Sequence, residues 1–272
     1  MDNLQQFFRS TAWSMEKPSA YGPFHLLVML VGFSLCVLLA WRLRNVSERG
    51  NRIVLLSVGL FLLVSEVYKQ LFYVFVVQPD LGREVSYPWW IFPFQLCSIP
   101  LYFCLIAPML KKGAVQKSLY NFLMSFNMLG GFIAFFEPSG LFHEYVTLTA
   151  HALIWHMMLV FVGVYLLLSG RGGIEKKDFL QSCGVWLALC GVALILNFSL
   201  WEVSGQDIHM FFLGPGHSSI IVFKQISMTC GWVVCTLIYI PVVAIGSWLL
   251  WLGFRAIRLA LNRRQQPETI TQ

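Results

Sequence analysis

Charged side chains are scarce in this chain. Only 12% of the 272 residues are Asp, Glu, Lys or Arg, about half of the ~25% that is usual in soluble domains. The apolar types Ala, Val, Ile, Leu, Met, Phe, Trp, Tyr and Cys supply 57%, and the mean hydropathy is +0.68. A soluble domain of this length could not bury so much apolar surface. The composition therefore predicts an all-α, polytopic membrane protein.

Several signals of other protein classes are missing. All seven cysteines lie inside apolar runs, and no CxxC occurs, which argues against a disulfide framework and a zinc ribbon. No short apolar run with a small-residue cleavage site begins the chain, so we expect no removable signal peptide. No motif for a soluble cofactor is present, and we expect none to be bound.

Seven apolar runs are long enough to predict transmembrane helices. They cover approximately residues 24–43, 53–77, 91–110, 119–136, 145–168, 179–201 and 230–252. We accordingly divide the chain into three parts. These are a polar N-terminal segment (1–23), a seven-helix membrane domain (24–258) and a cytoplasmic tail (259–272).

The basic residues are distributed unequally between the two ends of these spans. The loops after the first, third and fifth spans and the C-terminal end together hold 14 Lys and Arg, whereas the opposite side holds three. The positive-inside rule then places the N-terminus outside and the C-terminus inside. We expect a multi-pass protein of the cell membrane. The net charge of +6 follows from this topology, and we predict no nucleic-acid partner and no soluble protein partner.

Ionisable side chains within a span are costly and need an explanation. Glu66 and Lys69 lie three residues apart on the second span, and so on one helical face. They are either a neutralised pair that fixes helix packing or a pair that lines a polar cavity and orients a substrate.

The third span begins with an unusual sequence, Pro93-Phe-Gln-Leu-Cys-Ser-Ile-Pro100. Each proline removes a backbone donor, and irregular backbone at membrane depth is tolerated only inside protein or beside water. We therefore expect Gln95, Cys97 and Ser98 to border a cavity. Taken alone, Cys97 is better explained as a small packing residue, and its polar neighbours Gln95 and Ser98 weaken that explanation.

The fifth span carries two histidines, His151 and His156. Their side chains point about 140° apart around the helix, and the spacing differs from the i,i+4 pair of a zinc HExxH motif. Either can be a hydrogen-bonded packing residue. Asn197 on the sixth span is a further polar candidate, with an interhelical hydrogen bond as the alternative. Their depths along the helices place Cys97, His151 and Asn197 in the outer half of the membrane, together with the charged pair of the second span.

The motifs around Cys97, together with Phe142-His-Glu-Tyr and Thr149-Ala-His151-Ala, resemble the bacterial YwaF-like membrane proteins and their eukaryotic relative, transmembrane protein 164. The resemblance covers roughly residues 20–255. It implies a membrane acyltransferase that moves fatty acyl chains between phospholipids with a catalytic Cys and His. By matching motif these are Cys97 and His151, with His156 as a competitor. Bacterial members often carry His where this chain has Gln95.

On this reading Cys97 is the nucleophile, His151 is its base, and membrane phospholipids are the partners. Gln95, Ser98 or Asn197 would donate to the oxyanion.

Two other functions are compatible with the sequence. A transporter or ligand-binding membrane protein would use the pair of the second span as its binding or coupling site. A seven-span zinc hydrolase would need about three His and a carboxylate together, yet Glu66 is the sole mid-membrane acid. We therefore predict no metal site.

Overall fold

A computed structural model describes residues 2–83, 86–216 and 220–265. Within these ranges the chain forms helices and loops, with one isolated bridge between Ser14 and Tyr145. In the same ranges six helices are long and apolar enough to cross a membrane, and a shorter apolar helix covers Ile99–Met109. The predicted all-α polytopic architecture is therefore confirmed, with the shorter helix in the place of the third span.

Apart from the third and the last, the predicted spans lie close to helices of the structure. Their bounds are α1 Asp2–Ser10, α2 Pro23–Leu43, α3 Glu48–Phe72, α4 Gln78–Asp80, α5 Ile99–Ile106, α6 Ala114–Phe122, α7 Met128–Phe136, α8 Val146–Leu168, α9 Lys176–Ser199 and α10 Ile221–Gln265. One π-helical turn, Tyr73–Val77, joins α3 to α4, and another, Leu123–Asn127, joins α6 to α7. α3 with α4, and α6 with α7, therefore each form one continuous helical rod, because a π turn inserts a residue without ending the helix.

Local sequence signals fix where these helices begin. Pro23 opens α2, where its missing N–H costs nothing. The Ser47 hydroxyl caps α3 by accepting from the Gly50 N–H at 3.2 Å. Glu175 and Asp178 form a reciprocal capping box at the start of α9. Two of these signals, at Ser47 and Glu175, lie in basic loops, which therefore end where a capped helix begins.

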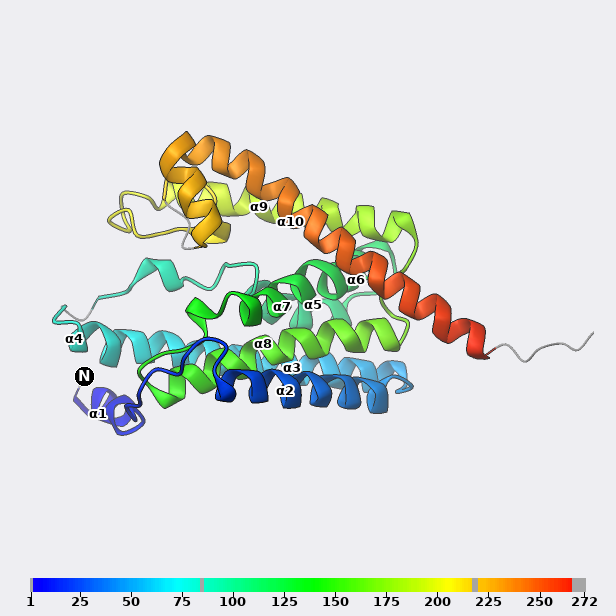
Figure 1. Ribbon diagram of the computed structural model, residues 1–272, viewed down its shortest axis with the longest axis horizontal. Helices are drawn as coiled ribbons and strands as arrows, with labels where there is room; N and C mark the ends of the chain where they lie inside the picture. Colours follow the sequence, from blue (N-terminus) through cyan, green and yellow to red (C-terminus); the bar gives the residue numbers. More distant parts are fainter. Residues whose placement is uncertain (1, 84–85, 217–219, 266–272) are drawn as a thin grey trace, which may run out of the picture.

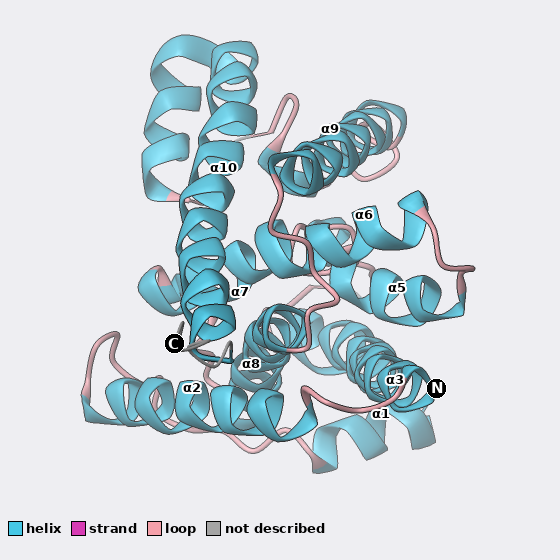
Figure 2. Cartoon of the chain, turned by 90° about the vertical axis from the view of Figure 1, so that its right-hand side faces the viewer, coloured by secondary structure: helices cyan, strands magenta, loops and turns pink. Residues whose placement is uncertain are grey.

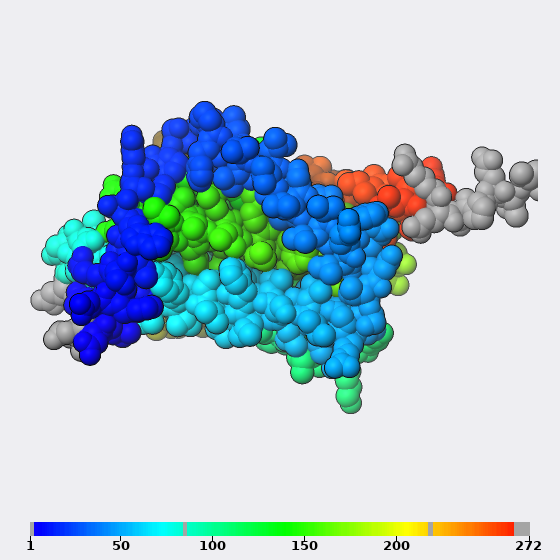
Figure 3. Space-filling view, turned by 90° about the horizontal axis from the view of Figure 1, so that it is seen from below, coloured from blue at the N-terminus to red at the C-terminus, as the bar shows by residue number. Residues whose placement is uncertain are grey.

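The helices are stacked in three layers (Figures 1 and 2). α2, α3 and α8 form one layer, and α9 and α10 form the opposite one, with α5, α6 and α7 between them. α8 lies between α2 and α3, as the space-filling view of this layer shows (Figure 3). Because α8 also contacts α7, its side chains connect the outer layer with the middle one.

The prediction of a helix over the whole of residues 91–110 is wrong in its first half. Residues 92–98 are not helical, and α5 begins only at Ile99. Pro93 cannot donate a helical hydrogen bond, and Pro100 lies in the first turn of α5, where proline is tolerated. The irregular entry expected from the prolines is thus present.

The last helix also differs from a simple span. Gly231 has φ 82° and ψ 162°, a conformation that essentially only glycine adopts. It divides α10 into a short arm from residue 221 to 230 and a long arm beside it (Figures 1 and 2). The long arm is the predicted seventh span and continues to Gln265. Residues 259–265 of the predicted tail are therefore helical, and residues 266–272 lie outside the described ranges.

The predicted polar N-terminal segment packs against the membrane domain. Phe8 is 3% exposed and lies against Tyr68 and Phe75 of the second span. Arg9 pairs with Asp80 at 2.7 Å. This segment therefore packs against the C-terminal end of α3, where Glu66 and Lys69 lie.

Candidate functional site

The ion pair expected on the second span is formed. The ammonium nitrogen of Lys69 lies 2.8 Å from Oε1 of Glu66, and the two side chains are 19% and 5% exposed. Gln70, one turn beyond Glu66, donates from Nε2 to the same oxygen at 2.5 Å and to the Ile91 carbonyl at 2.8 Å. Gln70 therefore connects the pair to the start of the irregular segment, a link that its i,i+4 spacing from Glu66 could have indicated.

The irregular segment 92–98 is held in place by side chains from other elements. The Tyr102 hydroxyl donates to the Pro93 carbonyl at 2.7 Å. Gln95 donates to the His209 carbonyl at 2.7 Å and accepts from the Phe211 N–H at 2.8 Å. The Tyr102 bond satisfies a backbone group that the missing helix leaves open, and the Gln95 bonds connect the segment to the loop at residues 209–211.

Trp155 of α8 brings Cys97 and His151 together. Its indole Nε1 donates to the Cys97 carbonyl at 2.9 Å. The same indole stacks on the His151 ring, with centroids 5.3 Å apart and planes inclined by 27°. His151 and Trp155 are one helical turn apart, so they share a face of α8. Sequence reasoning missed Trp155, although the i,i+4 spacing to His151 was visible.

The His151 ring has an uncommitted nitrogen. Its Nε2 is buried and has no hydrogen-bond partner among the described residues, while the ring contacts the Ser65 carbonyl of α3. A buried imidazole nitrogen without a partner is costly. It is therefore available to exchange a proton with a bound group.

Lys69 is the common electrostatic neighbour of the site. Its charge acts on the Cys97 thiol and on the rings of His151 and His156. Glu66 also acts on Cys97. Ser98, the next residue in the chain, is 5% exposed. Thus the cysteine, the histidine and the charged pair form one cluster.

His156 occupies a different environment from His151. Its Nδ1 donates to the Ala152 carbonyl at 2.7 Å, and its ring meets Phe135 edge-on at 6.4 Å. The hydrogen bond within its own helix occupies one ring nitrogen. The two histidines face different neighbours, in agreement with the angle between them expected from the helical period.

Asn197 hydrogen-bonds the same loop as Gln95, at residues 209–213. Its Nδ2 donates to the carbonyls of Met210 and Leu213 at 2.9 and 2.5 Å, and its Oδ1 accepts from the Met210 N–H at 2.7 Å. In this loop Phe211 and Phe212 have positive φ values of 53° and 55°, which is costly for an aromatic residue.

The two amides therefore hold a strained loop over the irregular segment. Asn197 uses both of its amide hydrogens on this loop, and Gln95 uses one of its two. Nothing in the sequence pattern indicated this role.

A cavity of about 280 Å³ lies beyond the C-terminal end of α3, beside α4 and the start of α8. Its lining includes Lys17, Asp80, His143 and Tyr145. The backbone N–H of His143 donates to the Thr149 hydroxyl of α8 at 2.9 Å, so the cavity lies at the end of the helix that carries His151. Burial, followed by the Lys17 charge, lowers the pKa of His143, whose imidazole is therefore neutral at pH 7. Burial and a hydrogen bond to Asp80 raise the pKa of Tyr145 to about 12.

Within the described ranges no group of three or more His, Cys, Asp or Glu side chains is arranged to hold a metal ion. Comparison with curated proteins and with solved structures gives no significant match. The sequence does match the TMEM164 family over residues 20–252, a range that includes the whole cluster around Cys97 and His151. Because this match covers most of the chain, the protein belongs to the TMEM164 family.

Proposed function

We propose that the protein is a phospholipid acyltransferase of the cell membrane, with Cys97 as nucleophile and His151 as base. The observation that supports this most directly is the Trp155 side chain, which contacts both residues. A thiol is a weak nucleophile until a neighbouring base removes its proton. For this purpose His151 has a buried ring nitrogen without a hydrogen-bond partner among the described residues.

The proposed reaction has two balanced steps. In the first, the Cys97 sulfur attacks the ester carbonyl of a donor phospholipid while its proton passes to His151. The ester C–O bond breaks, the lysophospholipid oxygen takes that proton, and a thioester remains on Cys97. In the second, His151 takes the proton of an acceptor lysophospholipid hydroxyl. That oxygen attacks the thioester, and the thiol is restored with the proton from His151.

The surroundings of the cluster fit a lipid substrate. Many apolar side chains of α2 and α3 are exposed, as expected where helices face acyl chains. The cavity beyond the end of α3 is lined by Lys17, whose charge suits a phosphate group, and by the neutral His143. Two acids, Asp80 and Glu144, also line it, and Asp80 is paired with Arg9. The head group would occupy this cavity while the ester reaches Cys97.

The oxyanion would be stabilised by Ser98, because Asn197 already uses both amide hydrogens, and Gln95 one of its two, on the backbone of residues 209–213. We therefore propose positioning roles for the two amides. They keep the loop in contact with the irregular segment and do not contact the substrate.

The proposal is tested with the purified protein in lipid nanodiscs. A phospholipid with an isotope-labelled acyl chain is the donor, a lysophospholipid is the acceptor, and mass spectrometry follows transfer. Cys97→Ala should abolish transfer together with hydroxylamine-sensitive labelling of the protein. Cys183→Ala, at another partly buried cysteine, is the matched control and should retain activity. Full transfer by folded Cys97→Ala would refute the nucleophile.

A transporter or ligand-binding protein remains the second candidate, because a charged pair lies at membrane depth in the cluster. Such a protein would bind its ligand through Glu66 and Lys69. The discriminating measurement uses Cys97→Ser, which leaves the pair intact. Ligand binding that survives in this variant, without any acyl transfer in the wild type, would favour the second candidate.

A further inference from the structure

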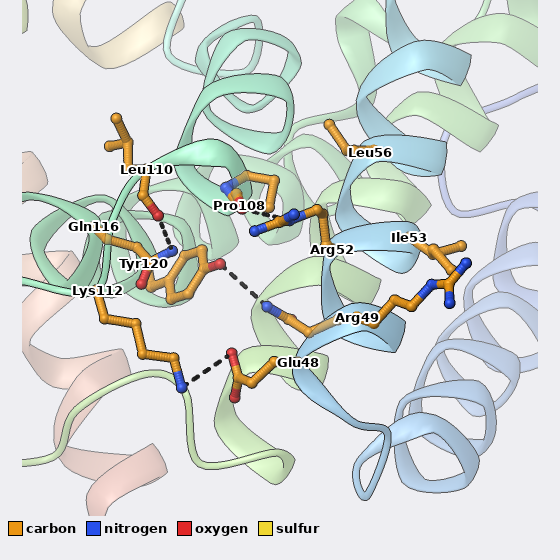
Figure 4. Close-up of a pocket in the computed structure, with 11 residues that line it drawn as sticks. Glu48, Arg49, Arg52, Ile53, Leu56, Pro108, Leu110, Lys112, Gln116 and Tyr120 are labelled. Carbon is orange, nitrogen blue, oxygen red and sulfur yellow. Dashed lines mark hydrogen bonds and ion pairs between the residues drawn. The ribbon is translucent and has the colours of Figure 1, made fainter.

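The opposite end of α3 carries a second and larger cavity. It has a volume of about 580 Å³ and lies between the start of α3 and the chain from residue 108 to 120 (Figure 4). Arg49 is 17 positions before Glu66 on the same rod, which places the cavity about 25 Å from the charged pair at ~1.5 Å per residue. It is therefore separate from the Cys97 cluster, and its volume is in the ~300–1,000 Å³ range of small-molecule sites.

The mouth of this cavity has an excess of positive charge. Arg49 has no ion pair or hydrogen bond among the described residues, and Arg52 donates from Nε to the Pro108 carbonyl at 3.2 Å, so its terminal amino groups stay available. Lys112 and Arg171 share the single carboxylate of Glu48, each at 3.6 Å. One acid thus faces several cations, and the site favours an anion.

Backbone oxygens that would repel an anion are already occupied. The turn after α5 ends beside the cavity, and the carbonyls at a helix end are normally left without partners. Gln116 donates from Nε2 to the carbonyls of Ala107 and Leu110 at 3.0 and 3.2 Å. Arg52 donates to the Pro108 carbonyl, so three carbonyl oxygens of this turn already accept a hydrogen bond. The lining therefore presents donors: Figure 4 shows Arg52 beside Pro108, Lys112 directed at Glu48, and the Arg49 guanidinium next to Ile53.

The same cavity has an apolar side that continues into the membrane. Ile53 and Leu56 lie one turn deeper than Arg49 and Arg52 on α3, about 6 Å along the helix. Both line the cavity, and Ile53 is 57% exposed. A ligand that touches both turns needs an anionic group and an adjoining hydrocarbon chain. This amphiphilic arrangement distinguishes a lipid from a soluble phosphate compound.

We propose that this cavity binds the head group of an anionic phospholipid from the leaflet at the basic end of the protein. Arg49, Arg52 and Lys112 contact the phosphate, and an acyl chain lies along Ile53 and Leu56. The charge bias of the loops predicts that this end faces the cytoplasm, whose leaflet carries the anionic lipids. The site does not depend on the proposed acyl transfer.

The test measures binding of dioleoylphosphatidylglycerol to the purified protein by native mass spectrometry and by thermal stabilisation in detergent. Dioleoylphosphatidylcholine is the zwitterionic comparison. At roughly 1 kcal/mol for each basic residue, Arg49→Gln should weaken binding of the anionic lipid about fivefold, and Arg49→Gln/Arg52→Gln about 30-fold. Arg49→Gln removes no ion pair or hydrogen bond among the described residues, so its result stands even if loss of Arg52 destabilises the protein.

The matched control is Arg42→Gln/Arg263→Gln, which removes two exposed arginines that do not line the cavity. This variant should bind the lipid like the wild type, and equal losses in both double variants would overturn the proposal in favour of diffuse surface charge. Inorganic phosphate alone should neither stabilise the protein nor displace the lipid. Stabilisation by phosphate that Arg49→Gln abolishes would instead identify a site for a soluble anion and overturn the lipid assignment.

Discussion

Replacing Glu66 with Gln removes the acidic half of the buried pair on α3. The two side chains are 5% and 19% exposed and 2.8 Å apart, so loss of one partner leaves the other nearly desolvated. Breaking a fully buried pair costs about 3–5 kcal/mol. Because Lys69 retains some exposure, we expect about 3 kcal/mol for Glu66→Gln.

Lys69→Met should cost less than Glu66→Gln. Glu66 keeps the Gln70 amide as a donor at 2.5 Å, whereas Lys69 forms no second ion pair among the described residues. The double variant leaves no charge stranded and should be milder than the sum of the two single variants. The expected coupling energy is about 2 kcal/mol, within the ~0.5–3 kcal/mol found for contacting residues.

The assay is equilibrium unfolding in mixed detergent micelles, with thermal melting as a second measure. A double-mutant cycle on Glu175 and Lys177 is the matched control, because that pair is 3.1 Å apart but about two-thirds exposed on each side. We expect no measurable coupling there. Additive effects at Glu66 and Lys69, with a coupling below about 0.5 kcal/mol, would refute the conclusion that the two charges are interdependent.

Three further predictions concern topology, loop anchoring and backbone conformation. A cysteine at Glu202 should react with an impermeant reagent in intact cells, and one at Lys111 should not; the reverse would overturn the charge-based topology. Asn197→Leu should destabilise the protein by about 3 kcal/mol, because it leaves buried backbone groups of Met210 and its neighbours unpaired at ~1–3 kcal/mol each; unchanged unfolding would show that this anchoring is unimportant. Gly231→Ala should cost about 1–3 kcal/mol through strain at its positive φ, whereas a neutral effect in thermal melting would mean that α10 is straight there.

The sequence alone determined the class of the protein and most of its helices. Apolar runs longer than a bilayer is thick have few alternatives to a transmembrane helix, and the long spans therefore lie close to their predicted positions. The pairing of Glu66 with Lys69 was also predictable, because residues three apart on a helix are neighbours whatever surrounds them. The prolines near Cys97 similarly indicated an irregular backbone.

Only the tertiary structure decided which of these local features meet. Trp155 connects His151 with Cys97, which lies 58 positions earlier in the chain. Helical periodicity could not predict this contact, because it does not fix how one helix is rotated against another. The amides of Gln95 and Asn197 converge on residues 209–213, a loop without a recognisable pattern. Contacts between distant segments depend on packing of the whole chain, so a single sequence specifies them only through the fold.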